Sequence, residues 1–181
     1  MLGGVQIDMR AKLDREFEEF VRARSASFLR TAALLVGDVD QAQDLLQQAL
    51  WRTHRHWGRT IDNPDAYLRK VLVNPVHDAR RHARRRVVER PLDDVAQAVV
   101  GDDTALLADR DALLAALRLI PPRQRVTLVL RFWDDLAVDE TAFVLGRSSG
   151  TVKSTTSKGL ANLRQILDGQ AKSELEPGSV K

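Results

Sequence analysis

The sequence predicts an all-α protein made of two small helical domains joined by an acidic linker. At 181 residues, 44% apolar and 29% charged, the chain suits one ordinary globular domain or two small ones. It has only one Tyr, five Phe and ten Gly, and no run rich in β-branched residues, so its intrinsic preference is for helix nearly everywhere. Apolar residues also recur at helical spacing in most segments.

The first half is predicted to form three helices. The apolar stripe places the first over residues 17–36, and the second runs from the cap Asp38 to Gly58. Asn63 followed by Pro64 is a typical start for the third. Pro75 lies inside this third helix and removes a backbone hydrogen bond, so we expect a kink or an early end there.

Charge changes sign near the middle of the chain. Arginines dominate residues 80–90, with almost no compensating carboxylate. Acidic residues dominate the stretch that follows, where Pro91 and Gly101 break any helical pattern. We therefore interpret residues 88–104 as an acidic linker between the domains.

The second half is predicted to be a four-helix domain that contains a helix-turn-helix. Its helices are expected over residues 105–120, 123–133, 137–145 and 150–167, followed by a frayed polar tail. The pair Asp134-Asp135 is expected to separate the second helix from the third and to cap the third. Gly146 is expected to end the third helix, and Ser148-Ser149 to cap the fourth.

The last two helices suit nucleic-acid binding. The order is typical of a helix-turn-helix that binds DNA: a short helix, a glycine turn, and a capped helix with hydroxyls and lysines on its outer face. Such side chains hydrogen-bond base edges and phosphates. The alternative is a solvated face on a plain helical hairpin, and periodicity alone leaves both interpretations open.

Longer runs of residues match a known family. Residues 119–126, 130–133, 140–142, 145–146 and 150–154 resemble the fourth region of sigma factors of the extracytoplasmic-function (ECF) type. Residues 37–49 resemble the polymerase-binding segment of that family, and residues 67–74 with the arginines after them resemble its promoter-melting helix. The resemblance covers residues 14–168 in family order, so it implies a promoter-specificity subunit of RNA polymerase.

The resemblance also implies domains and site residues. Residues 10–87 would be sigma region 2, residues 88–104 the linker, residues 105–169 sigma region 4 and residues 170–181 a flexible tail. The expected contacts with core polymerase are Asp44, Gln47, Gln48 and Trp51. The expected contacts with the −10 element are Asp62, Asn63, Asn74, His77, Arg80, Arg81 and Arg84. The expected contacts with the −35 element are Arg147, Ser149, Thr151, Lys153, Ser154, Ser157 and Lys158.

The implied partners are the β and β′ subunits of core RNA polymerase and promoter DNA, and an anti-sigma factor is a third partner that the resemblance allows.

Two positions depart from the family pattern. Gln48 stands where Glu is usual, which predicts a weaker or differently paired polymerase contact. Thr155 stands where Arg is frequent, which predicts altered −35 contacts.

Other function classes are less well supported. The absence of Cys excludes a disulfide framework and a thiol nucleophile, and no apolar run reaches the about 20 residues that span a bilayer, so we expect a cytoplasmic protein without membrane insertion. His77-Asp78 spells the metal-binding pair of HD phosphohydrolases, but its further ligands are not evident, so we expect no catalytic site, metal or cofactor. A stand-alone helix-turn-helix regulator would explain the second half equally well, but not the first.

Overall fold

The computed structural model describes residues 2–58, 61–77 and 107–175. These ranges contain seven α-helices, one π-helical turn and no strand, which confirms the all-α prediction. The helices of the first half are α1 (Leu2–Val36), α2 (Val39–His56) and α3 (Pro64–His77). Those of the second half are α5 (Leu107–Leu119), α6 (Pro122–Leu128), the π-turn η3 (Val129–Trp133), α7 (Val138–Leu145) and α8 (Ser149–Leu175).

The predicted helix boundaries of the first half are confirmed where local caps define them. Gly37 has the left-handed φ of 74° that ends α1, and the Asp38 carboxylate accepts a hydrogen bond from the Gln41 amide at 2.8 Å to start α2. The Asn63 side chain likewise accepts from the Ala66 amide at 3.0 Å and caps α3. Helix α3 continues for two residues past Pro75, and the predicted arginine run and linker lie outside the described residues.

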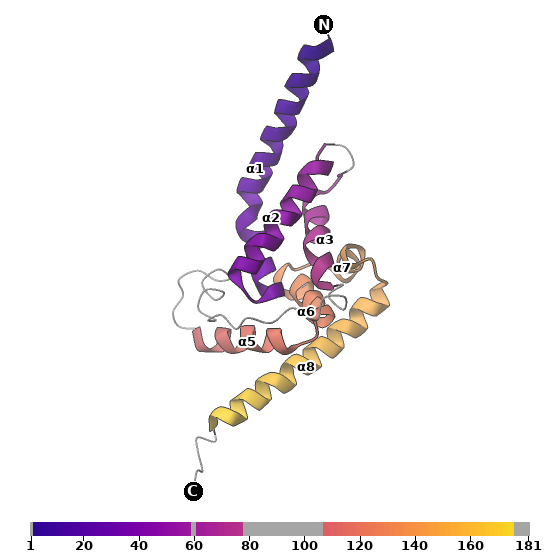
Figure 1. The fold of residues 1–181 in the computed structure, drawn as a ribbon. Coiled ribbons are helices and arrows are strands. Elements are labelled where there is room, and N and C mark those ends of the chain that lie inside the picture. Colours follow the sequence, from indigo (N-terminus) through magenta and orange to yellow (C-terminus); the bar gives the residue numbers. More distant parts are fainter. Residues whose placement is uncertain (1, 59–60, 78–106, 176–181) are drawn as a thin grey trace.

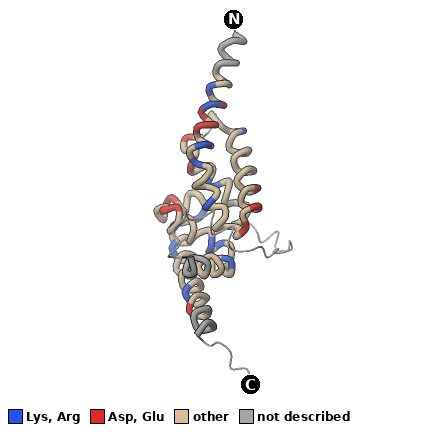
Figure 2. Tube along the Cα trace, turned by 90° about the vertical axis from the view of Figure 1, so that its left-hand side faces the viewer, with Lys and Arg blue, Asp and Glu red and all other residues tan. Residues whose placement is uncertain are grey.

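Helix α1 begins fifteen residues before the predicted start at Phe17. Its added turns are held by the end of α2, because the rings of Phe17 and Trp57 meet edge to face with centroids 5.1 Å apart. Leu13 also packs so closely on Gly58 that a Cβ there would lie 2.5 Å from its Cδ2 atom. Beyond these contacts α1 projects from the molecule (Figure 2).

The second half departs from prediction between α6 and α7. The expected continuous helix changes to π geometry after Leu128, and the Asp134 amide closes that turn on the Val129 carbonyl at 3.0 Å. Asp134 and Asp135 do not cap α7. Its N-cap is Ala137, whose amide donates to the Glu140 carboxylate at 2.7 Å.

Helix α8 extends eight residues beyond the predicted end at Leu167. It passes through Gly169, where a Cβ would meet nothing within 4 Å, so no tertiary contact requires a glycine there. A helical glycine costs about 1 kcal/mol relative to alanine, which is not enough to end a helix among good helix formers. The free ends of α1 and α8 project from opposite ends of the molecule (Figure 1).

The two halves pack against each other in this structure. Helix α3 contacts α6 and α7, and the C-terminal part of α1 contacts η3 and α5 (Figure 1). Buried apolar residues of both halves form one continuous cluster, in which Leu35 and Leu68 of the first half and Leu130 of the second are fully buried. The domain division at residues 88–104 remains a prediction, since that segment lies outside the described residues.

Candidate nucleic-acid interface

Helices α7 and α8 are joined by a tight turn that contains the predicted terminal glycine and the predicted serine cap. Gly146 adopts the left-handed conformation, with φ 60° and ψ 43°, and the next amide, of Arg147, donates to the Ala142 carbonyl at 2.9 Å. The Ser148 hydroxyl then accepts from the Thr151 amide at 3.2 Å and caps α8. Val152, in the first turn of α8, is fully buried. Its burial fixes the rotation of α8 about its axis, and therefore the direction of the outer face.

The expected −35 residues gather around the start of α8, and all but one are exposed. The exposed ones are Arg147, Thr151, Lys153, Ser154, Ser157 and Lys158. Ser149 is half-buried and its hydroxyl donates to the Asp139 carboxylate of α7, so in this structure it joins the two helices. The Ser154 hydroxyl donates to the Thr151 carbonyl at 3.0 Å, a local bond that it can exchange for a ligand.

A hollow of about 190 Å³ beside the start of α8 brings in Arg123 and Thr127, which the sequence did not predict as site residues. Its lining includes Arg123 at the start of α6, Arg147 in the turn, and the hydroxyl-bearing side chains of Thr127, Thr151 and Thr155. The remaining lining residues are apolar, and none is acidic. We call this the arginine hollow.

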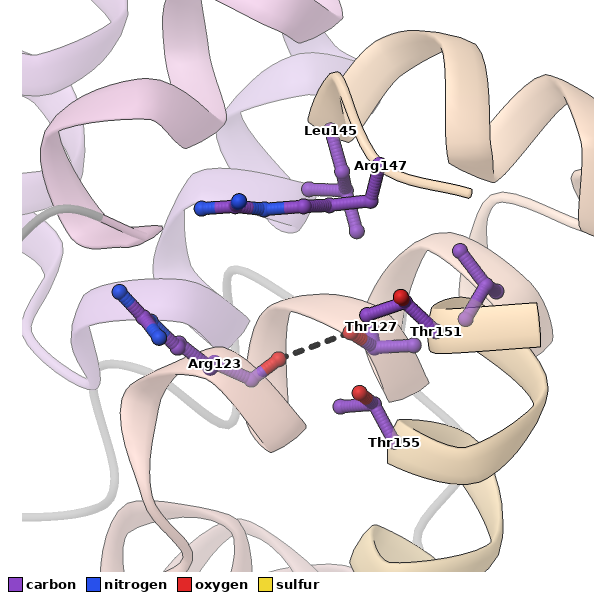
Figure 3. A pocket seen from close by; sticks show the side chains of 7 residues that line it. Arg123, Thr127, Leu145, Arg147, Thr151 and Thr155 are labelled. Carbon is purple, nitrogen blue, oxygen red and sulfur yellow. Dashed lines mark hydrogen bonds between the residues drawn. The ribbon is translucent and has the colours of Figure 1, made fainter. Parts of the chain in front are cut away.

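The polar groups of the arginine hollow differ in what they can offer. The two arginine side chains extend to the same side of the hollow (Figure 3). The Thr127 hydroxyl is occupied, because it donates to the Arg123 carbonyl at 2.8 Å (Figure 3). Arg123 and Arg147 are exposed, so their guanidinium groups are accessible to an anion. The sequence resemblance includes Arg123 within residues 119–126 but assigns it no site role, and the packing of α6 on α8 brings it to this hollow.

The expected polymerase-binding residues share the exposed side of α2. Asp44, Gln47 and Gln48 are exposed, while Ala42, Leu46, Ala49 and Thr53 are buried on the opposite side. Trp51 is 60% exposed, which is unusual for so large an apolar side chain. The guanidinium of Arg55 lies 4.9 Å from the centre of its ring.

The expected −10 residues are only partly within the described chain. Asp62 and Asn63 are exposed just before α3, and Asn74 is exposed near its end. The Asn63 oxygen already caps α3, which leaves its amide nitrogen for a ligand. The side chain of His77, and Arg80, Arg81 and Arg84 altogether, lie outside the described residues.

The histidines of α2 have structural neighbours. The Nε2 atom of His54 lies 3.3 Å from the Asp14 carboxylate, and its ring lies 4.7 Å from that of Phe17. Within the described ranges, no group of three or more His, Asp or Glu side chains is placed to hold a metal ion. None of the described helices is long and apolar enough to cross a membrane.

Comparison with known proteins agrees with this arrangement. Residues 110–163 match the family description "Sigma-70, region 4", a range that runs from most of α5 through α6, η3 and α7 to the first part of α8. The fold is similar to that of the sigma factor RpoE from Bartonella quintana, solved in complex with the anti-sigma factor NepR. The TM-score is 0.58 at 21% identity, over 85% of this chain and 98% of that one.

Curated relatives are similar over most of their length. The RNA polymerase sigma-E factor of Streptomyces avermitilis is 44% identical over 157 residues, which span 86% of this chain and 87% of that protein. The ECF RNA polymerase sigma factor SigM of Mycobacterium tuberculosis (strain H37Rv) is 31% identical over 153 residues, spanning 83% and 76%. The chain therefore belongs to the ECF family of RNA polymerase sigma factors, which direct the initiation of transcription at promoters.

Proposed function

We propose that this chain binds core RNA polymerase through the outer face of α2 and leads it to promoters that carry a −10 and a −35 element. The observation that carries this proposal is the exposed polar face at the start of α8, directly after the tight turn at Gly146. A helix presented in this way can enter the major groove with its N-terminal residues against base edges.

The −35 element would be read and held by different side chains. Lys153 and Ser154 are exposed within the first two turns of α8, where short polar side chains can reach the bases. The arginine hollow suits a backbone phosphate, because two arginines and the hydroxyl-bearing side chains of Thr151 and Thr155 line it and no carboxylate does. In this division the bases specify the site, while the phosphate fixes the register of the protein on DNA.

The −10 element would be opened and held by the first half. The exposed pair Asp62-Asn63 offers hydrogen-bond donors and acceptors to a base taken out of the stack. Asn74 on α3 and the arginines after it would follow the separated strand, as a cationic track does in other single-strand binders. The roles of His77, Arg80, Arg81 and Arg84 rest on the sequence resemblance alone.

The outer face of α2 is the proposed polymerase contact. Trp51 combines a large exposed apolar ring with polar neighbours, Gln47 and Gln48, which is typical of a binding hot spot. The replacement of the usual Glu by Gln48 predicts a contact that depends less on charge. An anti-sigma factor as a further partner is supported by the RpoE neighbour, which was solved with one.

We further propose that the chain catalyses no reaction itself and acts in the cytoplasm, where polymerase and promoter DNA meet. Residues 10–87 and 105–169 would be its two functional domains, joined by the acidic segment 88–104. The separate match of residues 110–163 to region 4 supports the second of these units.

Reconstitution tests the proposal directly. The purified chain is added to core polymerase with a promoter selected by the holoenzyme from a random library, and run-off transcripts are measured. We expect transcription that requires the chain, the core enzyme and both promoter elements. A chain that binds duplex DNA tightly, but neither binds core nor supports transcription, would instead be a stand-alone regulator.

A further inference from the structure

A buried carboxylate joins the two halves of the molecule. The Asp134 side chain, just after η3, is 6% exposed. The Thr31 hydroxyl of α1 donates to its Oδ1 atom at 2.7 Å, and the Arg69 Nε of α3 donates to its Oδ2 atom at 3.2 Å. Both partners belong to the first half, 103 and 65 residues away along the chain.

Other contacts surround this one. The Arg118 guanidinium of α5 donates to the carbonyl of Gly37, between α1 and α2. The Lys70 ammonium of α3 lies 5.9 Å from the centre of the Phe143 ring on α7. With the shared apolar cluster, these contacts hold the two halves together, and α3 lies directly against α6 and α7.

This packing is incompatible with simultaneous reading of the two promoter elements. The −10 and −35 positions are about 25 base pairs apart, and ten base pairs span about 34 Å, so the elements are separated by about 85 Å. In the structure α3 packs on α6, and α6 packs on α8. Two such helix contacts, at about 10 Å each, put α3 and α8 about 20 Å apart.

The packed form also places negative charge beside the proposed −10 site. A hollow between α3 and α7 is lined by Asn63 and Arg69 on one side and by Asp139 and Glu140 on the other. A DNA strand at Asn63 would bring its phosphates close to these two carboxylates. Phosphates and carboxylates repel each other, so the packed form disfavours binding of the −10 strand. This repulsion is independent of the separation between the two promoter elements.

We propose that Thr31, Arg69 and Asp134 form a latch that holds the free chain closed, and that this latch must open before the −10 and −35 elements are bound together. The inference rests on the proposed function. Arg69 and Asp134 are separated from water together in the closed form, and each regains hydration when the halves part.

The electrostatics of the latch suit a contact that can be released. Burial raises the pKa of the Asp134 carboxyl, although the Thr31 hydrogen bond and the Arg69 charge both act to lower it. The cost of removing this carboxylate from water therefore offsets much of what its two partners contribute, whereas removing one partner alone would leave the other buried and unpaired. Such a contact defines one arrangement of the halves without making it irreversible, which leaves polymerase binding able to open it.

A reversible crosslink tests the proposal. The chain has no Cys, so Lys70→Cys and Phe143→Cys introduce a single pair, one on each half. A bismaleimide with a disulfide in its spacer locks the closed form, and a reductant releases it. We expect run-off transcription to fall at least tenfold in the crosslinked protein and to recover after reduction.

The controls distinguish failure of the latch proposal from failure of the proposed function. The same double variant treated with a monofunctional maleimide sets the reference activity, because it carries both substitutions and both modifications without the crosslink. If the crosslinked protein is as active as this control, the closed form need not open and the latch proposal is overturned. If the reduced protein and the unmodified chain both fail to transcribe with core polymerase, the proposed function fails instead.

A second measurement tests the latch residues themselves. Donor and acceptor dyes on Gln41→Cys of α2 and Gln165→Cys of α8, both exposed positions, report the distance between the halves. Arg69→Ala and Asp134→Ala should each raise the ratio of open to closed chain at least fivefold. Arg24→Ala is the matched control, because it removes an ion pair, to Asp65 at 2.9 Å, that lies wholly within the first half. An unchanged ratio in both latch variants, or an equal change in the control, would overturn the proposal.

Discussion

Removing the arginines of the arginine hollow should change how DNA binding responds to salt. Arg123 and Arg147 are exposed and both line this hollow, and no acidic residue among its lining competes with a phosphate. Each phosphate contact that is lost should flatten the slope of log K against log salt by about 0.9. We therefore expect a change of about 0.9 for Arg123→Ala and about 1.8 for the double variant.

The size of the effect follows from these slopes. Between 0.1 and 0.3 M salt, one contact accounts for about a 2.7-fold loss of affinity, and two for about sevenfold. The affinity deficit of the double variant relative to the unmodified chain should therefore shrink about sevenfold over this range. Because phosphates carry no sequence information, the deficit should be similar on intact and scrambled −35 duplexes.

Fluorescence anisotropy with labelled duplexes over a salt series measures both quantities on the full chain. Arg22→Ala is the matched control, since it removes the same charge from an exposed position on α1. An equal flattening in the control would mean that net charge, and not a local phosphate, is responsible. A changed preference for the −35 sequence in Arg123→Ala would refute the assignment of this residue to the backbone.

The remaining predictions concern other parts of the molecule. Trp51→Ala should weaken binding to core polymerase at least tenfold while leaving helicity unchanged, as pull-down and circular dichroism would measure. Lys153→Ala should relax sequence preference at one or two −35 positions, by roughly 1 to 3 kcal/mol for a base contact, in competition binding. Gly37→Ala should lower the free energy of unfolding by about 1 to 3 kcal/mol, because φ is 74° and its Cβ would meet a side chain of α5 at 2.5 Å; Gly169→Ala, in an open helical position, should not. Because burial raises the pKa of Asp134, the closed form binds the proton of this carboxyl more tightly than the open form does. The closed fraction should therefore rise as pH falls through the raised pKa, and should be lowest when Asp134 is charged. The dye pair measures this fraction, and Asp134→Asn should abolish its dependence on pH.

Much of the fold could be predicted because its signals are local. Gly37, Asp38, Asn63 and Ser148 each define a helix end through a bond to a residue within four positions. The buried face of α2 could also be predicted, because the helical period of its apolar residues agrees with their burial. The exposed face at the start of α8 could be predicted for the same reason, because its residues lie within one short stretch of the chain.

The missed features depend on distant neighbours. The early turns of α1 are stabilised by Trp57 and Gly58, which follow them by about forty residues. Arg123 joins the proposed −35 surface only because α6 packs on α8. A pattern within one helix cannot reveal either contact, because it says which side of the helix is buried and not what buries it.

Asp134 shows most directly how a distant partner overrides a local rule. Two adjacent aspartates between two helices favour a cap, since a carboxylate at a helix start usually accepts from the first free amides. Here Glu140 occupies the Ala137 amide at 2.7 Å, and the π-turn directs Asp134 towards Thr31 and Arg69. A capping carboxylate would remain near water in any arrangement of the two halves. The Asp134 carboxylate loses water only when the two halves meet, so its protonation and its hydrogen bonds depend on closure. A contact that polymerase binding releases must depend on closure in this way.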